Sequence, residues 1–492
     1  MQIDWHLLLY GLSWLFAISN MVLAIFAFNM YFMLALTIRY WHASANHLPP
    51  LAEVDWPSVL VQLPIYNERY VVERLIDAVA GLTYPTDRLI IQVLDDSTDD
   101  TVALAQARVA YHHVRGLHIE YIHRVERIGY KAGALSAGMA VTPGDFIAIF
   151  DADFVPSPDF LYRLIPEFSD QPRLGMVQAR WGHLNAEQNL VTRAMMLAVD
   201  SFFAVDQVAR SGAGLFMNFN GSACILRRAC IEDAGGWQYE TLVEDMDLSY
   251  RALIKGWRIK YRSDVVVPGE LPVSIITLKQ QQYRWAKGAT QVVYKLGGKV
   301  IFSRKPLFHK ILGMVHLSGY LPHPLIVFSL VLSLPVVLLN GQTPIHWGLM
   351  GLATLAPPLA ILWGQLLLRH KQGMNWLYFP VIFLIGIGMA VTDTRAIWDA
   401  LFIHANVFVR TPKFGQVNHR ESLYALPVDG CTWVELALAL YGFATTLLAI
   451  QRAPALVPFI LIYTAGFGFT ALTGFWQSRG VRLGQVVEQP IS

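Results

Sequence analysis

The chain is poor in charged residues and in cysteine for its length. Only 15% of its 492 residues are charged, against about 25% in ordinary soluble proteins. Its net charge is +2, so bulk electrostatics gives no reason to expect a nucleic-acid partner. The three cysteines are odd in number and form no zinc-binding pattern. These absences argue against a disulfide framework and indicate a reducing compartment.

The sequence contains several long apolar runs. The first, residues 5–38, has no basic residues ahead of it and no small-residue cleavage site, so it predicts a retained membrane-spanning helix. Arg39 and the aromatic residues after it place this end in the cytoplasm by the positive-inside rule. Four more runs are each long enough to cross about 30 Å of hydrocarbon: those near 311–339, 346–368, 433–450 and 453–475.

Two further segments are less regular. Residues 376–391 are apolar but lie between basic segments that should both be cytoplasmic. We therefore expect this segment to dip into the membrane and return, or to pack obliquely, with an ordinary sixth span as the alternative. Residues 272–300 mix apolar and basic side chains, which indicates an interfacial amphipathic segment that seats the central region on the bilayer.

Residues 55–310 hold most of the acids and look like a soluble α/β domain. Apolar stretches predict four strands, followed in turn by helical patterns, and this alternation predicts a parallel sheet with right-handed crossovers. The predicted strands are 59–64, 89–94, 118–123 and 146–150. Ligands of such sheets collect beyond the carboxyl ends of the strands, so we expect the acids that follow two of these strands to share one rim.

Asp151 and Asp153 follow the fourth predicted strand. Two carboxylates there suit Mg²⁺ or Mn²⁺ carrying a phosphate group, and the alternative is a turn with solvated acids. Asp96 follows the second strand and suits a nucleotide's base or ribose, unless it only caps the next helix. Lys131, between two glycines, suits a diphosphate, and a solvated surface lysine is equally plausible.

Further along, Glu244, Asp245 and Asp247 precede a helical pattern. An acid here can act as the general base that removes a proton from an acceptor hydroxyl, or it can merely favour a helix N-terminus. Residues 219–222 are small and polar in an apolar context, which fits either a sugar-binding loop or a plain turn.

Gln281, Arg284 and Trp285 share one face of a predicted helix. The tryptophan offers a flat surface for a sugar ring, and the arginine can neutralise a phosphate. The alternative is a tryptophan and arginine anchor at the membrane interface.

The ordered set of motifs resembles the membrane-bound processive enzymes of glycosyltransferase family 2, the cellulose synthase superfamily. It looks most like the cellulose-synthase-like A group, whose plant members make β-1,4-mannan or glucomannan, and its bacterial relatives. The resemblance is dense over residues 55–300. The motifs are LPIYNE (63–68), VLDDSTDD (93–100), GYKAGAL (129–135), FDADF (150–154), FNGS (219–222), LVEDMD (242–247) and QQYRW (281–285).

The resemblance implies an α/β glycosyltransferase-A-type domain, a nucleotide-diphospho-sugar transferase fold, inserted between transmembrane helices. We expect an N-terminal span over 1–41, a linker over 42–57, the cytosolic catalytic domain over 58–271, interfacial helices over 272–306, a C-terminal membrane region over 307–476 and a tail over 477–492.

The resemblance also implies roles for individual residues. Asp245 stands at the family's catalytic base, in a Thr-Glu-Asp motif that here begins with Val243, and Asp151 and Asp153 match its metal motif. The implied nucleotide-sugar-binding residues are Pro64, Tyr66, Glu68, Asp96, Lys131, Asp151, Gln281 and Arg284. The implied acceptor-binding residues are Phe219, Asn220, Gly221, Ser222, Glu244 and Trp285, with Asn220 where the cellulose synthases have cysteine.

The implied reaction is inverting, processive transfer from GDP-mannose or UDP-glucose to a growing β-linked glycan of mannan, glucomannan or β-glucan type, with Mg²⁺ or Mn²⁺ and with passage of the product across the membrane. The alternatives are a single transfer to ceramide, diacylglycerol or polyprenyl phosphate, and an inactive membrane scaffold. The expected location is a bacterial inner or plasma membrane, or the Golgi in a eukaryote. A homo-oligomer is left open as an assembly state.

Overall fold

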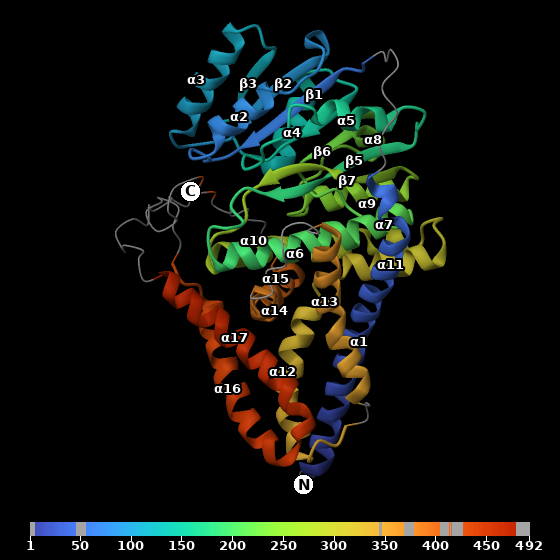
Figure 1. Cartoon of the computed structure of the whole chain (residues 1–492), viewed down its shortest axis with the longest axis vertical. Helices are drawn as coiled ribbons and strands as arrows, with labels where there is room; N and C mark the ends of the chain where they lie inside the picture. Colours follow the sequence, from blue (N-terminus) through green and yellow to red (C-terminus); the bar gives the residue numbers. More distant parts are fainter. Residues whose placement is uncertain are drawn as a thin grey trace.

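The computed structural model describes residues 5–45, 56–343, 347–368, 378–403, 413, 415 and 427–478. An α/β block lies at one end of the molecule and a bundle of long helices at the other, with α6 (Leu190–Ser201) and α10 (Ile275–Ile301) between them (Figure 1). Most of the predicted linker and tail, residues 46–55 and 479–492, lies outside the described residues.

The block is built on a seven-stranded sheet in the order β3-β2-β1-β4-β6-β5-β7. All four predicted strands are present, and β1, β2, β3 and β4 are parallel. The carboxyl ends of the first three are level, because Ile65 pairs with Asp95 and Asp95 with His123. The strands are β1 (Val59–Ile65), β2 (Leu89–Asp95), β3 (Ile119–His123), β4 (Phe146–Ile149), β5 (Leu174–His183), β6 (Cys224–Arg227) and β7 (Arg258–Gly269).

Our prediction of a parallel sheet was wrong for one strand, because β6 runs antiparallel to both β4 and β5. Its first residue, Cys224, pairs with Ile149, the last residue of β4. The strand therefore starts at the rim where β4 ends. This reversal carries the preceding loop, residues 219–222, to the acids that follow β4.

Alternation along the strands explains the two cores of the block. Val59 and Val61 point to one face of the sheet and Leu60 to the other, with all three buried. Helices α2, α3 and α5 cover the first face, and α4, α8, α9 and part of α10 cover the second. The remaining elements here are α2 (Val72–Ala80), η2 (Thr86–Arg88), α3 (Thr101–Val114), α4 (Tyr130–Val141), α5 (Phe160–Leu164), η3 (Ile165–Phe168), η4 (Phe202–Gln207), α7 (Val208–Gly212), α8 (Arg228–Asp233) and α9 (Glu244–Ile254).

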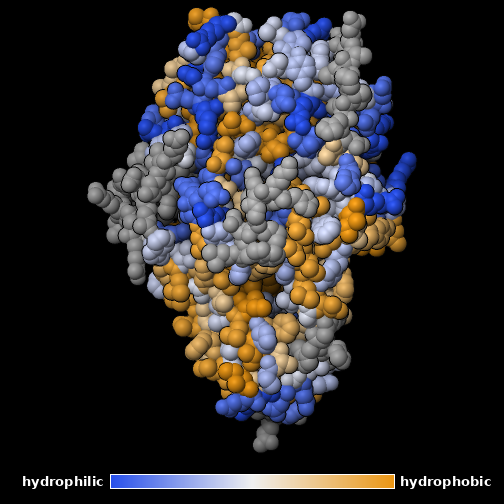
Figure 2. Space-filling view, in the orientation of Figure 1, coloured by the Kyte–Doolittle hydropathy of each residue, from blue (hydrophilic) through white to orange (hydrophobic). Residues whose placement is uncertain are grey.

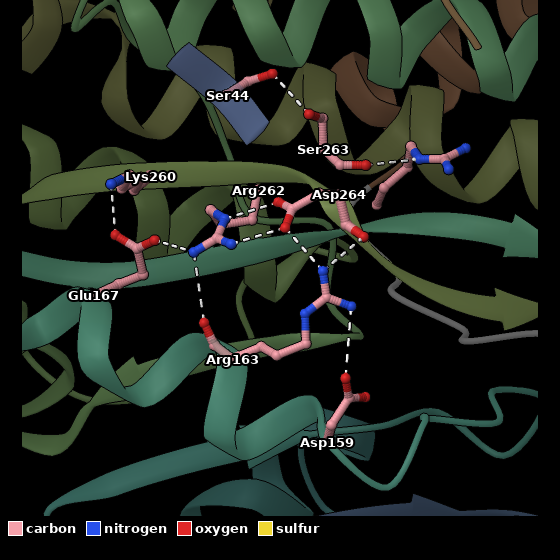
Figure 3. A network of polar contacts seen from close by, with 9 residues as sticks. Ser44, Asp159, Arg163, Glu167, Lys260, Arg262, Ser263 and Asp264 are labelled. Atoms are coloured by element: carbon pink, nitrogen blue, oxygen red, sulfur yellow. Dashed lines mark hydrogen bonds and ion pairs between the residues drawn. The ribbon is translucent and has the colours of Figure 1, made fainter. Parts of the chain in front are cut away.

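A network of ion pairs fixes β7, whose end leads into α10. The Arg262 guanidinium pairs with Glu167 of η3 and, at 2.8 Å, with Asp264 of its own strand (Figure 3). Asp264 also pairs with Arg163 of α5 at 2.8 Å. Because Arg262 and Glu167 are both buried, breaking one partner would leave an uncompensated charge in the core.

The helical end has the composition of a membrane region. Figure 2 shows hydrophobic residues over most of its surface, with hydrophilic residues returning at its far tip. Among the described residues, five helices are long and apolar enough to cross a membrane. The helices of this end are α1 (Trp5–Tyr40), η1 (His42–Ala45), α11 (Leu307–Leu317), α12 (Pro322–Leu338), α13 (Trp347–Leu368), α14 (Phe379–Gly388), α15 (Ala390–Phe402), α16 (Gly430–Arg452), η6 (Pro454–Leu456) and α17 (Val457–Ser478).

The predicted run near 311–339 is not one helix. It breaks into α11 and α12, which are bent by 66° relative to one another. The break fits the sequence, because Gly319 lies within it and Pro322 begins the second helix, where its missing N–H is tolerated. The stretch from Phe379 to Phe402 also has the length and composition of a span. This agrees with the alternative of an ordinary span, and our expectation that residues 376–391 dip into the membrane and return, or pack obliquely, stays a prediction.

Candidate active site

The two acids after β4 are fixed by backbone contacts at the rim of the sheet. The Asp151 N–H donates to Ser222 Oγ at 2.9 Å, and the Glu270 N–H donates to Asp153 Oδ2 at 3.2 Å. Burial raises the pKa of Asp151, although the ammonium of Lys131 opposes that rise. The pair is therefore held by the loop before β6 on one side and by the residue after β7 on the other.

Lys131 joins three of the predicted motifs. From the first turn of α4, its Nζ lies 2.6 Å from Asp151 Oδ1 and 3.5 Å from Glu244 Oε1, and it donates to the Gly221 carbonyl at 2.9 Å. Burial alone would lower the pKa of Lys131, but Asp151, Glu244 and Asp245 together raise it. The ammonium therefore stays charged at the centre of the acids.

Asp245 lies in the first turn of α9 and faces the same point. A Cβ placed on Gly221 would lie 3.1 Å from Asp245 Oδ2 and 3.3 Å from Lys131 Nζ, so only glycine leaves this space open. Burial and then the neighbouring Glu244 raise the pKa of Asp245 to about 7, although Lys131 opposes them. A carboxyl group that titrates near neutral pH suits general-base catalysis.

Helix α10 brings the last predicted motif to the acids. The helix begins with a capping box at Ser274, and its first five residues, 275–279, are buried. Burial lowers the pKa of Arg284, and four nearby carboxylates oppose this effect: those of Glu244, Asp151, Asp245 and Asp153. Gln281 and Trp285 lie half-buried on the same helix, one turn apart. The structure thus places the arginine of this motif beside both acid pairs.

The predicted nucleotide end of the rim is rich in arginine. Asp96 makes a two-point ion pair with Arg124, at 2.7 and 2.6 Å, and the guanidinium of Arg127 lies 3.4 Å from the centre of the Tyr66 ring. Pro64 lies in β1, in line with Leu94 of β2. The sequence analysis missed both arginines. They follow a strand at the same rim, so the rule that selected Asp96 would have selected them too.

The loop of residues 219–222 is held by its backbone. The N–H of Phe219 donates to Ser249 Oγ at 3.1 Å, and the N–H of Asn220 donates to Gln178 Oε1 at 2.8 Å. Phe219 and Ser222 are buried, whereas Asn220 is half-exposed. Phe219 thus anchors the loop in the core, and Asn220 is the one member of these four that is partly exposed.

Lys413 reaches the site from a segment between α15 and α16. Its Nζ lies 2.6 Å from Asp153 Oδ2 and donates to the Glu270 carbonyl at 3.3 Å. Burial would lower the pKa of Lys413, but Asp153, Glu270 and Glu68 together raise it. Glu68, a buried residue of the predicted donor site, is thus among the acids near Lys413. Nothing in the local sequence indicated Lys413, because its partner is 260 residues away.

The acids after β4 fit a divalent cation that a phosphate group completes. Within the described ranges, no group of three or more His, Cys, Asp or Glu side chains could hold a metal by itself. Asp151 and Asp153 each hold an ammonium group at 2.6 Å, so both carboxylates face positions that favour positive charge. Two carboxylates with open positions are the set that Mg²⁺ or Mn²⁺ takes when phosphates and waters supply the other ligands.

The sequence also matches a known protein family. Residues 146–391, which run from β4 into the membrane region, match the family described as "Glycosyl transferase family group 2". The chain belongs to this family. The resemblance expected from the motifs is confirmed.

Several curated relatives of this glycosyl transferase family member are plant proteins. It is 40% identical over 340 residues to "Probable glucomannan 4-beta-mannosyltransferase 3" of Oryza sativa subsp. japonica, covering 67% of this chain and 60% of that protein. It is 39% identical over 321 residues to "Glucomannan 4-beta-mannosyltransferase 2" of Arabidopsis thaliana, covering 63% of this chain and 60% of the relative. The chain thus spans about 60% of the length of these relatives.

A solved structure shows the fold. The mannosyltransferase PcManGT from Pyrobaculum calidifontis, in complex with GDP-Man and Mn²⁺, matches with a TM-score of 0.51 and 22% identity, over 77% of this chain and 99% of that one. The glycosyltransferase-A-type fold expected from the sequence is therefore confirmed, together with apolar helices on both sides of the α/β block.

Proposed function

We propose that this protein is an inverting, processive hexosyltransferase. It would use GDP-mannose or UDP-glucose to elongate a β-linked polysaccharide of mannan, glucomannan or β-glucan type. The observation that carries the proposal is the convergence of Asp245, Lys131 and Asp151 around Gly221, where three separate motifs meet. The curated relatives, named glucomannan mannosyltransferases, support this substrate class.

The chemistry follows from the charges at this point. Asp245 takes the proton of an acceptor hydroxyl as that oxygen forms a bond to the anomeric carbon of the donor sugar. The bond from that carbon to the diphosphate breaks on the opposite face, and the leaving diphosphate keeps the electron pair. Lys131 and Arg284 lie where they can neutralise the charge that develops on it. Mg²⁺ or Mn²⁺, held by Asp151 and Asp153, would supply further charge neutralisation.

We assign the remaining predicted residues by their place around this centre. Asp96, Tyr66, Pro64 and Glu68 lie on the donor side, where β1 and β2 end. Gln281, on the same helix as Arg284, stays with the donor diphosphate. On the acceptor side we place Glu244, Trp285 and the loop of residues 219–222. The arginines that hold Asp96 and stack on Tyr66 give the donor side positive charge suited to a nucleoside diphosphate.

The position of the block on the helices supports passage of the product into the membrane. Helix α10 lies between the two, with α9 on one side and α15 and α17 on the other (Figure 1). We propose that the protein is integral to a bacterial inner or plasma membrane, or to the Golgi in a eukaryote, with the catalytic block in the cytosol. A homo-oligomer is compatible with this arrangement.

The test is a donor panel on the full-length protein in nanodiscs, with sizing and linkage analysis of the product. We expect β-linked polymer from GDP-mannose or UDP-glucose, and a fall in turnover of about 10²- to 10⁴-fold in Asp245→Asn. Asp100→Asn, at an exposed position just before α3, serves as the matched control. A single-sugar lipid product would contradict processive synthesis, and no release of nucleoside diphosphate with any donor would favour an inactive scaffold.

A further inference from the structure

Each carboxylate of the metal motif is paired with a lysine of this chain. Asp151 forms an ion pair with Lys131 of helix α4. Asp153 forms one with Lys413, which follows α15 in the sequence. The two ammonium groups come from different parts of the fold and lie at the same distance, 2.6 Å, from their carboxylates. Each acid that would bind a cation is therefore neutralised by a lysine of the chain itself.

Lys413 donates a hydrogen bond to one carboxylate oxygen of Asp153. That oxygen, Oδ2, accepts from Lys413 Nζ at 2.6 Å and from the Glu270 N–H at 3.2 Å. The backbone N–H belongs to the residue after β7 and is fixed by the sheet. Lys413 is a flexible side chain, so a cation that takes this oxygen must displace the lysine rather than the backbone group.

The surroundings keep the lysine in place. The side chains of Asp153 and Lys413 are only 7% and 15% exposed, so water screens their attraction weakly. Lys413 also donates to the Glu270 carbonyl, and the Glu270 carboxylate is in turn held by Arg74 at 2.7 Å and by the Gly415 N–H at 3.3 Å. These contacts attach Lys413 and Gly415 to the end of β7.

We propose that Lys413 is an internal competitor of the divalent cation for Asp153, so that cation and nucleoside diphosphate bind cooperatively. Without nucleotide, a cation must displace the ammonium and gains only water as its other ligands. With a diphosphate present, the phosphates add oxygen ligands to the cation and give the displaced ammonium a new partner. By linkage, the cation then strengthens nucleotide binding by the same factor. This inference rests on the proposed function.

The test measures Mn²⁺ binding to the full-length protein in nanodiscs, with free Mn²⁺ followed by electron paramagnetic resonance, in the presence and absence of GDP. We expect Lys413→Met to bind Mn²⁺ about tenfold more tightly than wild type without GDP. Addition of GDP should tighten Mn²⁺ binding much more in wild type than in the variant. Lys413→Arg, which keeps the charge, should behave like wild type, and so should Lys299→Met at an exposed position of α10.

Adding Asp153→Asn to the Lys413→Met variant tests whether the Mn²⁺ is bound at Asp153. Loss of this carboxylate should abolish the tight Mn²⁺ binding of Lys413→Met. Unchanged or weaker Mn²⁺ binding in Lys413→Met without GDP, in protein that still elutes as a folded species, overturns the proposal. So does the absence of any GDP effect in wild type. The proposed function fails separately, if wild type releases no nucleoside diphosphate from any sugar donor whatever its Mn²⁺ affinity.

Discussion

At the scale of single residues, the site depends on one lysine among several acids. Lys131 contacts Asp151, Glu244 and the Gly221 carbonyl, and its charge lowers the pKa of Asp245 against the effects of burial and Glu244. The pKa of Asp245, the proposed base, is thus set by two opposing effects. A base of this kind works only when it is deprotonated, so its rate must rise with pH through its pKa.

The pH profile of the Lys131→Met variant tests this balance. In wild type we expect kcat/KM to rise with pH and to level off above about pH 7, where Asp245 is ionised. Removing the ammonium removes an effect that lowers the pKa, so the rise should move to higher pH, in addition to any loss of rate. The measurement is kcat/KM for release of nucleoside diphosphate between pH 5 and pH 9, in buffers of constant ionic strength. A profile that keeps its midpoint while its height falls would show that Lys131 does not tune Asp245.

At the scale of elements, polar contacts buried within the helical end position α10. Lys279, two residues before Gln281 and five before Arg284, lies 2.8 Å from Glu435 of α16, and the two side chains are 2% and 0% exposed. Tyr283 donates to Asp399 of α15 at 2.6 Å. These contacts fix the rotation of α10 and hence the direction in which its site residues point.

A double-mutant cycle tests this buried pair. Lys279→Met alone should lower the free energy of unfolding by about 3–5 kcal/mol, because Glu435 is left with an uncompensated charge. Combining it with Glu435→Leu should restore stability close to that of wild type, since apolar side chains of similar size replace the pair. The free energy of unfolding of wild type, both single variants and the double variant is measured in mixed micelles by tryptophan fluorescence. If the loss of stability in the double variant equals the sum of the losses in the two single variants, the two side chains do not interact.

The same elements show what the sequence alone can predict. The strands from Val59 to Ile149 could be predicted because each is a short apolar run between turn residues, and the rim acids follow from the rule for parallel strands. The antiparallel β6 could not, because strand direction depends on which neighbours a strand finds. The contact between Lys413 and Asp153 could not either, since it depends on how the membrane helices return the chain to the block.

At the scale of the whole molecule, the catalytic block rests on a helix that also contacts the membrane helices. Trp285 lies on this helix, next to Arg284, whose charge faces the acids of the site. Helix α10 lies between the block and the helical end (Figure 1). In the proposed reaction, a growing glycan that leaves the block toward the helical end passes the level of this helix. The two halves of the reaction, donor cleavage and chain extension, should therefore depend on different residues.

Trp285→Ala should separate these two halves. Loss of the ring removes a flat surface for a sugar but leaves Asp245, Lys131 and Arg284 in place, so chain extension should fall by more than donor hydrolysis does. The measurement compares polymer length and nucleoside diphosphate release in the same reaction. Trp433→Ala, at an exposed position near the start of α16, is the matched control and should change neither. An equal loss of both activities in Trp285→Ala would assign the tryptophan to donor binding or to packing, because an acceptor contact alone does not slow hydrolysis by water.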